Sequence, residues 1–174
     1  GGFISTQDEG LAETLRMLRD HGQKSKDEIV CFGFNSRLDN IHAALAMVKM
    51  GQLPRWIERR RAIADCYYES LRDIPALRLP PPPDRESNYY DVFSSFVVRN
   101  KSRDELKQHL QKNKVEVYAH CAIPLYHQES LDLGHWDLPM TERISQEVLS
   151  LPLYPELTDA DLQYVIAQVR AFFE

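Results

Sequence analysis

Asn35 and Arg37 stand two positions apart, just before a segment whose apolar residues recur at helical spacing. Three kinds of hydrogen-bond donor converge at such a helix start. They are an amide, a guanidinium that can form two parallel hydrogen bonds, and the free N–H groups of the first turn. This combination favours binding of an anion such as phosphate. An asparagine cap beside a surface arginine explains the same two residues, and both interpretations stay open at this point.

Three histidines and a cysteine crowd a later stretch, namely His120, Cys121, His127 and His135. They could be metal ligands, but their spacing matches no zinc-binding pattern and they straddle the turn-forming Pro124. We therefore expect no metal site. Cys121 follows His120 directly, and adjacent residues of a strand point to opposite faces, so His120 is poorly placed to take a proton from the thiol.

The composition argues against several classes of protein. The 21 Lys and Arg residues against 26 Asp and Glu give a net charge of −5, so we expect no nucleic-acid-binding face. No apolar run approaches the length of about 20 residues that crosses a bilayer. Three cysteines without a C-x-x-C pair indicate reduced thiols, and we expect a cytoplasmic protein without membrane association. The sequence also lacks a glycine-rich phosphate loop, H-E-x-x-H and G-x-S-x-G.

The first 76 residues predict three helices. Residues 1–6 read as a turn and a short strand without an initiator Met, so we expect a further part of the protein upstream. Thr6 and Glu9 form a capping box for a first helix that ends at Gly22. Residues 23–34 are predicted as a loop. A second helix follows and is interrupted at Gly51 and Pro54.

A third helix is predicted from Pro54 to Leu71, with Trp56, Ile63, Tyr67 and Leu71 directed inward. Its opposite face carries a basic run, Arg55 and Arg59–Arg61, which we interpret as a solvated face with Glu58 and Asp65 as local partners. The run Pro80–Pro83 favours an extended connector, and a domain boundary is expected within residues 77–87.

The remainder predicts a small α+β unit with a sheet of a few antiparallel strands and helices on one face. Period-2 and β-branched patterns predict the strands, and hydroxyl residues at candidate caps predict the helix starts. The predicted strands are 92–99, 115–119 and 149–153, and the predicted caps are Ser102 (with Glu105), Thr141 and Thr158.

The segment from Gly33 to Ala44 resembles the motif G-x-N-x-R-[LM]-x-x-[IL]-x-A-A of the DegT/DnrJ/EryC1/StrS family, the pyridoxal-phosphate-dependent nucleotide-sugar aminotransferases. Four further segments resemble motifs of this family in the same order. They are Gly1–Thr6 (end of G-[DE]-G-G), Glu58–Tyr67 (E-R-R-x-x-I-A-x-x-Y), His120–Leu125 (H-Y-x-x-P-L) and Leu149–Thr158 (L-S-L-P-L-x-P-x-[LM]-T).

The resemblance implies the C-terminal part of an aspartate-aminotransferase-type α/β fold. Residues 1–76 would be the end of the large cofactor domain with long connecting helices. Residues 77–87 would be the proline-rich linker, and residues 88–174 the small C-terminal α+β domain with a short antiparallel sheet. The family works as a homodimer with a shared active site and uses pyridoxal 5′-phosphate.

The resemblance also implies roles for individual residues. Asn35 matches the asparagine that reaches the cofactor phosphate of the neighbouring subunit, and Arg37 and His120 match positions that contact the nucleotide-sugar. Cys121 stands where the family usually has Tyr, and residues 126–127 are Tyr-His in place of the usual His-Leu. Ser36 replaces a frequent aromatic residue.

The family's Schiff-base lysine lies upstream of its G-G pair, so we expect it before Gly1 and expect no catalytic residue in this chain. None of the lysines present occupies its place; these are Lys24, Lys26, Lys49, Lys101, Lys107, Lys112 and Lys114. The predicted function is that of the C-terminal portion of an aminotransferase. It would move an amino group from a donor such as glutamate to a nucleotide-linked ketosugar in polysaccharide or glycan precursor biosynthesis. A non-enzymatic dimerisation or regulatory module with the same fold is the alternative.

Overall fold

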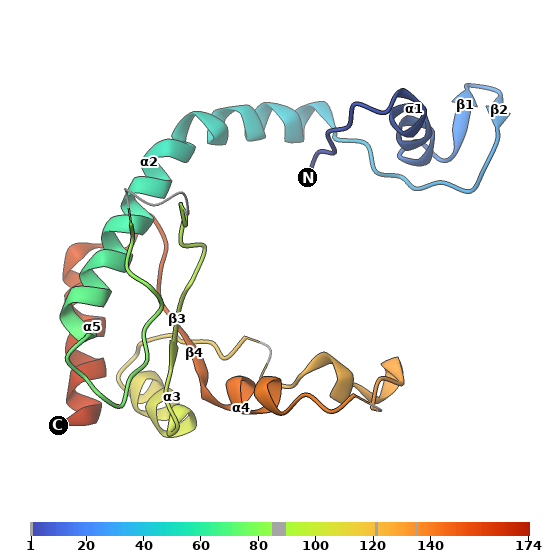
Figure 1. The fold of residues 1–174 in the computed structure, drawn as a ribbon. Helices are drawn as coiled ribbons and strands as arrows, with labels where there is room; N and C mark the ends of the chain where they lie inside the picture. The colour runs from blue at the N-terminus through green and yellow to red at the C-terminus, as the bar shows by residue number, and fades with distance from the viewer. Residues whose placement is uncertain (1, 85–89, 121, 135) are drawn as a thin grey trace. The chain divides into compact units, whose positions relative to one another are not determined.

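The computed structural model describes residues 2–84, 90–120, 122–134 and 136–174. Two compact units divide the chain, an N-terminal unit (Gly1–Leu53) and a C-terminal unit (Pro54–Glu174), which are described separately below (Figure 1). The division predicted from the sequence, with domains at 1–76 and 88–174 and a linker at 77–87, stays a prediction. Residues 85–87 of that linker lie outside the described residues.

Helix α1 (Glu9–Leu18) opens the N-terminal unit, and Asp8 caps it rather than Thr6. The Asp8 carboxylate accepts a hydrogen bond from the Leu11 backbone N–H at 2.9 Å, whereas Thr6 Oγ1 accepts from the N–H of Asp8 at 3.1 Å. The predicted capping box is therefore wrong. Aspartate is as good a cap as threonine and stands directly before the first helical residue.

A hairpin of β1 (Gln23–Ser25) and β2 (Glu28–Ile29) follows, where a loop was predicted. The two strands pair antiparallel with an irregular register. They are polar and largely exposed, so they lack the alternation of apolar residues from which a half-buried strand is inferred.

Helix α2 (Asn40–Leu71) is continuous over 32 residues and contains Pro54, so the predicted interruption at Gly51 and Pro54 is wrong. A proline removes one backbone donor, at a cost of about 3 kcal/mol, but the neighbouring hydrogen bonds can still continue the helix. The boundary between the two units falls inside this helix, at Pro54.

The sheet of the C-terminal unit is built on β3 (Phe96–Arg99) and β4 (Val148–Leu151), which pair antiparallel from Phe96↔Leu151 to Arg99↔Val148. Isolated bridges extend it on both sides, Arg78↔Arg99 next to β3 and Tyr118↔Ser150 next to β4. The antiparallel sheet is as predicted, although the expected strand 115–119 contributes only this bridge.

The helices of this unit are α3 (Arg103–Lys112), α4 (Pro139–Glu147) and α5 (Asp159–Phe173), with short 3₁₀ turns η1 (Leu125–His127) and η2 (Glu129–Leu131). Thr158 caps α5 as predicted, because its side chain accepts from the Asp161 N–H. Ser102 occupies the N-cap position of α3 as predicted, but its side chain makes no cap hydrogen bond. The predicted cap at Thr141 is wrong, because α4 begins at Pro139.

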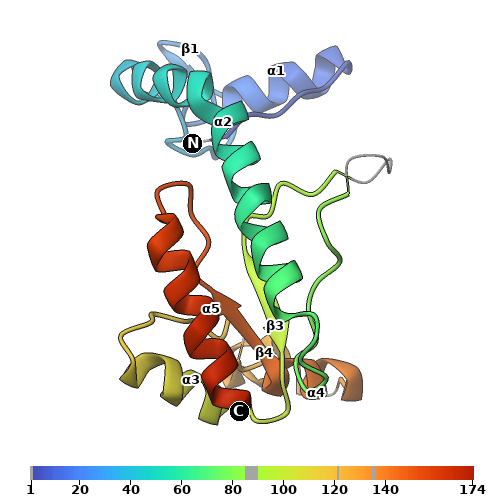
Figure 2. The same cartoon turned by 90° about the vertical axis from the view of Figure 1, so that its left-hand side faces the viewer.

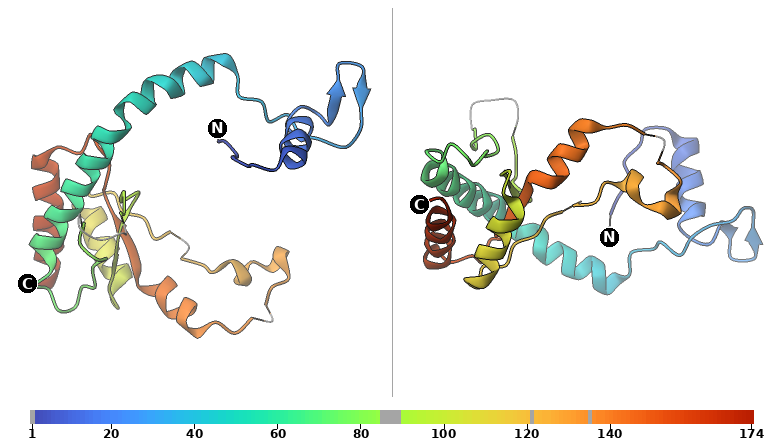
Figure 3. Two further views of the ribbon diagram at one scale, coloured as in Figure 1. Left: turned by 45° about the horizontal axis from the view of Figure 1, so that its top comes forward. Right: turned by 90° about the horizontal axis from the view of Figure 1, so that it is seen from below.

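The hydrophobic core lies where α5 and the Pro54–Leu71 part of α2 run side by side along the sheet (Figures 2 and 3). Its largest fully buried side chains are Tyr67, Phe96, Ile63, Leu71, Leu106 and Leu110. The Tyr67 hydroxyl donates to the Pro152 carbonyl at 2.9 Å, and burial raises the pKa of this phenol well above its ordinary value. No described helix is long and apolar enough to span a bilayer.

Arg59, Arg60 and Arg61 of the basic run are bound to distant backbone carbonyls, so the interpretation as a solvated face is wrong for these three, whereas Arg55 is exposed as expected. Arg61 is only 5% exposed, donates to the Asp91 and Asp84 carbonyls at 2.5 and 2.7 Å, and stacks on the Tyr90 ring. Arg60 donates to three carbonyls, those of Phe93, Ser94 and Leu153. Asp84, the segment 91–94 and the segment 152–157 form no regular ladder, and the multiple donors of arginine satisfy carbonyl groups there.

Candidate functional site

The segment that carries Asn35 and Arg37 is pinned by its backbone to the end of α1. Phe34 donates to the Leu18 carbonyl at 2.6 Å and accepts from the His21 N–H at 2.9 Å, and Ser36 donates to the Arg19 carbonyl at 2.9 Å. Asn35 itself forms an antiparallel bridge with Asp20. The backbone of the motif is thus held like a short edge strand, and its side chains project from a fixed support.

The Asn35 side chain is exposed and makes no hydrogen bond within the described part of the chain. Helix α2 begins at Asn40, so Asn35 lies too far upstream to cap it, and the interpretation as a helix cap is wrong. An amide held on a fixed backbone with its N–H donors free fits a phosphate oxygen as an external acceptor.

Arg37 lies on the same segment and pairs with Asp20, with Nη1 at 3.2 Å from Oδ1. The Arg37 side chain is 55% exposed, so this pairing leaves most of the guanidinium open to solvent. An ion pair at such exposure contributes about 0–1 kcal/mol. Asp20 Oδ1 is itself buried and lacks a hydrogen-bond partner among the described residues, so the pairing both orients Arg37 and compensates this oxygen.

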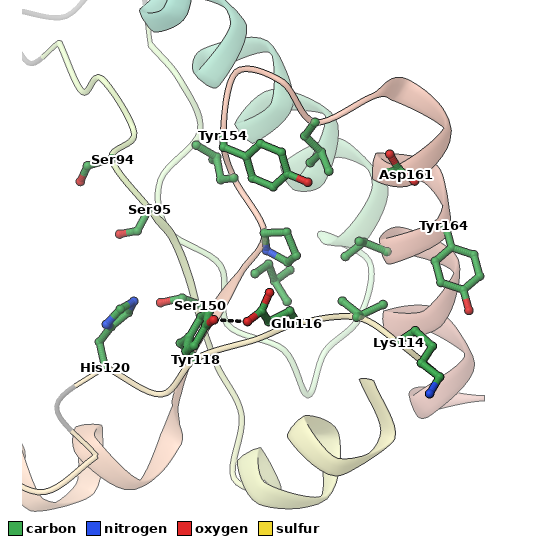
Figure 4. Close-up of a pocket in the computed structure, with 16 residues that line it drawn as sticks. Ser94, Ser95, Lys114, Glu116, Tyr118, His120, Ser150, Tyr154, Asp161 and Tyr164 are labelled. Atoms are coloured by element: carbon green, nitrogen blue, oxygen red, sulfur yellow. Dashed lines mark hydrogen bonds between the residues drawn. The ribbon is translucent and has the colours of Figure 1, made fainter. Parts of the chain in front are cut away.

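His120 belongs to the C-terminal unit, where it lines a groove of about 510 Å³ (Figure 4). Ser94 and Ser95 lie at the same end of the groove as His120, and Tyr118 separates them from the opposite end. The His120 and Tyr118 rings are 6.0 Å apart, centre to centre. The His120 end therefore offers hydroxyl groups and an imidazole, which suit a hydroxylated ligand.

The opposite end of the groove carries Lys114 and Asp161, and Glu116 lies beside Tyr118 between the two ends (Figure 4). The Tyr118 phenol donates to the Glu116 carboxylate, and this hydrogen bond raises the pKa of Tyr118. Sequence reasoning missed Ser94 and Ser95 as lining residues. The available signal was a pair of hydroxyl residues inside the otherwise apolar stretch 92–99.

His127 is engaged by a carboxylate instead of forming part of a histidine cluster. Its Nε2 lies 2.8 Å from Glu142 Oε1. Among the described residues, no group of three or more His, Cys, Asp or Glu side chains could hold a metal ion. Cys121 and His135, the other members of the sequence cluster, lie outside the described residues.

The structure places Asn35 and Arg37 on one segment of the N-terminal unit and His120 in the C-terminal unit. Within its own unit, each side chain is exposed on a backbone that neighbouring elements hold. Their assignment to cofactor and substrate stays a prediction.

The model of the DegT/DnrJ/EryC1/StrS aminotransferase family matches residues 1–170. The chain is 36% identical over 176 residues to the "Pleiotropic regulatory protein" of Geobacillus stearothermophilus, covering 99% of this chain and 47% of that protein. It is also 36% identical over 180 residues to the dTDP-3-amino-3,4,6-trideoxy-alpha-D-glucose transaminase of Streptomyces venezuelae, covering 100% of this chain and 46% of the relative. The chain thus spans about half the length of these relatives.

Solved structures with the same fold superpose on this chain. The crystal structure of S. venezuelae DesV in complex with ketimine intermediate superposes with a TM-score of 0.88 at 34% identity, over 97% of this chain and 46% of that one. A DegT DnrJ EryC1 StrS aminotransferase from Brucella abortus gives a TM-score of 0.85 at 31% identity, over 97% and 45%. The predicted aminotransferase-type α/β fold is confirmed. Since the family model matches residues 1–170 and the fold agrees, the chain belongs to the DegT/DnrJ/EryC1/StrS aminotransferase family.

Proposed function

We propose that this chain is the C-terminal portion of a pyridoxal-phosphate-dependent enzyme that transfers an amino group to a nucleotide-linked ketosugar. The observation that carries the proposal is the match to a transaminase of a dTDP-linked sugar along the whole chain, at 36% identity. Other relatives bear names of the same kind, among them a dTDP-3-amino-3,6-dideoxy-alpha-D-galactopyranose transaminase and a UDP-2-acetamido-2-deoxy-3-oxo-D-glucuronate aminotransferase. Both dTDP and UDP sugars occur, so the common substrate class is a sugar attached to a nucleoside diphosphate.

Asn35 is proposed to hold the phosphate of the cofactor. Its exposed amide has no partner within the described part of the chain, and the bridge with Asp20 fixes its backbone, so its N–H donors fit an anionic acceptor. When bound, pyridoxal phosphate would supply the electron sink for proton removal from the amino donor and for the reverse process, in which the ketosugar gains an amino group and a proton. A relative of 25% identity, NtdA from Bacillus subtilis, is described with bound cofactor PMP.

Arg37 and His120 are proposed to hold the nucleotide-sugar. The largely exposed guanidinium of Arg37 suits the diphosphate, because it offers paired N–H donors and a permanent charge. The groove end around His120 presents uncharged hydroxyl groups and suits the hydroxylated part of the ligand. The chain's contribution to the reaction is therefore to bind and orient the substrate.

The rest of the proposal concerns the parent protein. It would be a cytoplasmic homodimer in polysaccharide or glycan precursor biosynthesis, with an active site shared between subunits and an amino donor such as glutamate. The lysine that carries the cofactor would lie upstream of Gly1, so this chain alone would be inactive.

The test is to locate the cofactor lysine in the full-length protein. Reduction with borohydride in the presence of pyridoxal phosphate, followed by peptide mass spectrometry, should label one lysine upstream of Gly1. Stoichiometric labelling of a lysine within residues 1–174 would overturn the assignment of this chain as the half without the catalytic group. A transamination assay with dTDP- and UDP-linked ketosugars then identifies the substrate class.

A non-enzymatic role of the same fold is a second candidate, because one relative is named a pleiotropic regulatory protein and another an erythromycin biosynthesis sensory transduction protein. The same labelling experiment discriminates the two. A full-length protein without any reducible lysine adduct would favour the regulatory role.

A further inference from the structure

The two central strands of the C-terminal unit separate where their ladder ends. Phe96 of β3 pairs with Leu151 of β4, whereas Ser94–Ser95 before β3 and Pro152–Tyr154 after β4 lie outside the ladder. Both of these strand ends line the groove that also contains His120 (Figure 4). They form two walls of the groove, so the spacing between them helps to set its shape.

One side chain of α2 bonds both walls. Arg60 Nη1 donates to the Ser94 carbonyl at 3.1 Å and to the Leu153 carbonyl at 3.2 Å, and it also lies 3.3 Å from the Phe93 carbonyl. Because Nη1 carries two hydrogen atoms, at least one of them is shared between two acceptors. A single nitrogen therefore keeps carbonyl groups of both walls at hydrogen-bonding distance.

The conformation of Phe93 makes the first wall dependent on this arginine. Phe93 has a φ of +50°, in the left-handed region that bulky residues rarely adopt. Its side chain is buried, its N–H donates to Asp91 Oδ1 at 2.7 Å, and its carbonyl accepts from Arg60. An unfavourable backbone conformation persists only where surrounding contacts impose it. Removal of the guanidinium takes away one of these contacts.

The second wall is tied to α2 at further points. The Tyr67 hydroxyl donates to the Pro152 carbonyl at 2.9 Å, and Arg59 Nη2 donates to the Leu157 carbonyl at 2.5 Å. These two bonds do not involve Arg60 and should persist without it. Loss of the Arg60 donors should therefore change the spacing between the walls while the second wall stays on α2.

We propose that Arg60 is a positioning residue that fixes the spacing of the groove walls at Ser94 and Leu153, and thereby the fit of the hydroxylated part of the nucleotide-sugar. The inference rests on the proposed binding of that ligand at this groove. Arg60 acts through carbonyl groups of residues that line the groove and does not line the groove itself. The Ser94 and Ser95 hydroxyls, at the same end as His120, are the groups whose placement depends on it.

The first test measures the walls without any ligand, by hydrogen–deuterium exchange of the full-length protein. Arg60→Met keeps an unbranched side chain and removes the donors. It should accelerate exchange of the Phe93 amide about tenfold, because the hydrogen bond of this amide to Asp91 depends on the local conformation. Peptides of α3 should be unchanged. Arg60→Lys keeps a cation with three N–H donors and should restore exchange to within about threefold of the unaltered protein.

Arg170→Met is the matched control. Arg170 also bonds a distant backbone carbonyl, that of Ser70, but it does not line the groove or bond either wall. Its variant should leave exchange at Phe93 unchanged. Unchanged exchange at Phe93 after Arg60→Met would overturn the proposal, and so would equal acceleration throughout the C-terminal unit. The second result would make Arg60 a general stabilising residue.

The second test asks whether the spacing of the walls affects the ligand. Calorimetric titration of the full-length protein with dTDP-glucose and UDP-N-acetylglucosamine gives the Kd for Arg60→Met, for Ser94→Ala combined with Ser95→Ala, and for the triple variant. Arg60→Met should weaken binding about tenfold when both serines are present and less than about twofold when both are replaced. Independent, multiplying losses would overturn the inference, and so would a Kd that Arg60→Met leaves unchanged.

These experiments separate the inference from the proposed function. If the paired serine variant and His120→Ala both leave the dissociation constants unchanged, or neither nucleotide-sugar binds the unaltered protein, the proposed use of the groove fails. The exchange result then still decides whether Arg60 fixes the walls. If the ligands bind and the serine variant weakens binding but Arg60→Met does not, the inference alone fails.

Discussion

Gly33 lies so close to Gly22 that a Cβ atom on Gly33 would be 2.1 Å from the Gly22 nitrogen. Gly22 in turn adopts a φ of +74°, and a Cβ there would be 1.8 Å from the Cys31 carbonyl oxygen. The first glycine of the G-x-N-x-R motif is therefore required by close backbone approach, and this approach places Asn35 and Arg37.

Gly33→Ala should consequently disturb the segment 33–37 as a whole. We expect a loss of about 1–3 kcal/mol in stability, because backbone must shift to admit the methyl group, and weaker retention of the cofactor in the full-length protein. Thermal unfolding and equilibrium dialysis measure the two effects. Gly51→Ala is the matched control: it has open space in α2 and should stabilise by about 0.5–1 kcal/mol. Cofactor retention in Gly33→Ala equal to that of the control would contradict this account.

Asn35→Ala should weaken cofactor binding by the full-length dimer about ten- to a hundredfold. A hydrogen bond to a charged group contributes about 1.5–3 kcal/mol, at roughly 1.4 kcal/mol for each factor of ten. Because α2 begins at Asn40, the variant should change the melting temperature of the cofactor-free protein little. Equilibrium dialysis measures the affinity, and Asn40→Ala serves as the control. A lower melting temperature at unchanged affinity would leave Asn35 without its proposed role.

The proposed shared site allows a mixing experiment with the same variant. Subunits with Asn35→Ala, mixed with subunits that lack the cofactor lysine, should regain activity in hybrid dimers. In each hybrid dimer, one active site then lacks both the cofactor lysine and the Asn35 amide, and the other active site has both. Absence of recovery, with hybrid formation verified by native mass spectrometry, would show that Asn35 serves the site of its own subunit.

Much of the C-terminal unit could be predicted from the sequence, because burial and periodicity coincide there. Thr158 caps α5, and the apolar residues that recur at helical spacing after it, Leu162, Val165, Ile166 and Val169, are buried. Pro54 was misjudged because local propensity alone does not reveal that a long helix can tolerate one lost hydrogen bond. The partners of Arg59–Arg61 lie 23 to 100 positions away, beyond the reach of any local pattern.

Only part of the candidate site could be predicted from the sequence. Asn35, Arg37 and His120 are exposed, and their use in binding stays a prediction. The contacts of Glu142 Oε1 with the Tyr126 hydroxyl and His127 Nε2 could not be predicted, because a glutamate in the first turn of a helix is common and its two partners lie 15 and 16 positions upstream. Only the folded chain shows that one oxygen serves both.

Arg37→Ala in the full-length enzyme should weaken nucleotide-sugar binding while leaving the half-reaction with the amino donor intact. His120→Ala should act likewise but less strongly, because imidazole carries less positive charge near neutral pH than guanidinium does. Single-turnover absorbance changes of the cofactor separate the two half-reactions. Asp20→Asn tests whether the ion pair itself matters, and we expect a change of less than about 1 kcal/mol in stability. Equal damage to both half-reactions would indicate a structural role for Arg37.

The stability of the C-terminal unit should decrease in acid because of Glu147. The hydrogen bond from Arg99, together with the charges of Arg99, Arg143 and Lys101, lowers the pKa of Glu147 below its ordinary value of 4.5. A carboxyl whose folded-state pKa is depressed stabilises the fold above the unfolded-state pKa and loses this contribution as the pH falls through the folded-state value. The decrease should therefore begin below about pH 4.5. Urea unfolding followed by circular dichroism between pH 7 and pH 3 measures this decrease in stability.

Glu147→Gln should reduce the decrease of stability in acid without abolishing it, since Arg170 lowers the pKa of Asp73 in the same way. Glu105→Gln, at an exposed position of α3, should retain the full slope. An acid limb in Glu147→Gln as steep as that of the unaltered chain would show that the Arg99–Glu147 pair does not set the pH dependence.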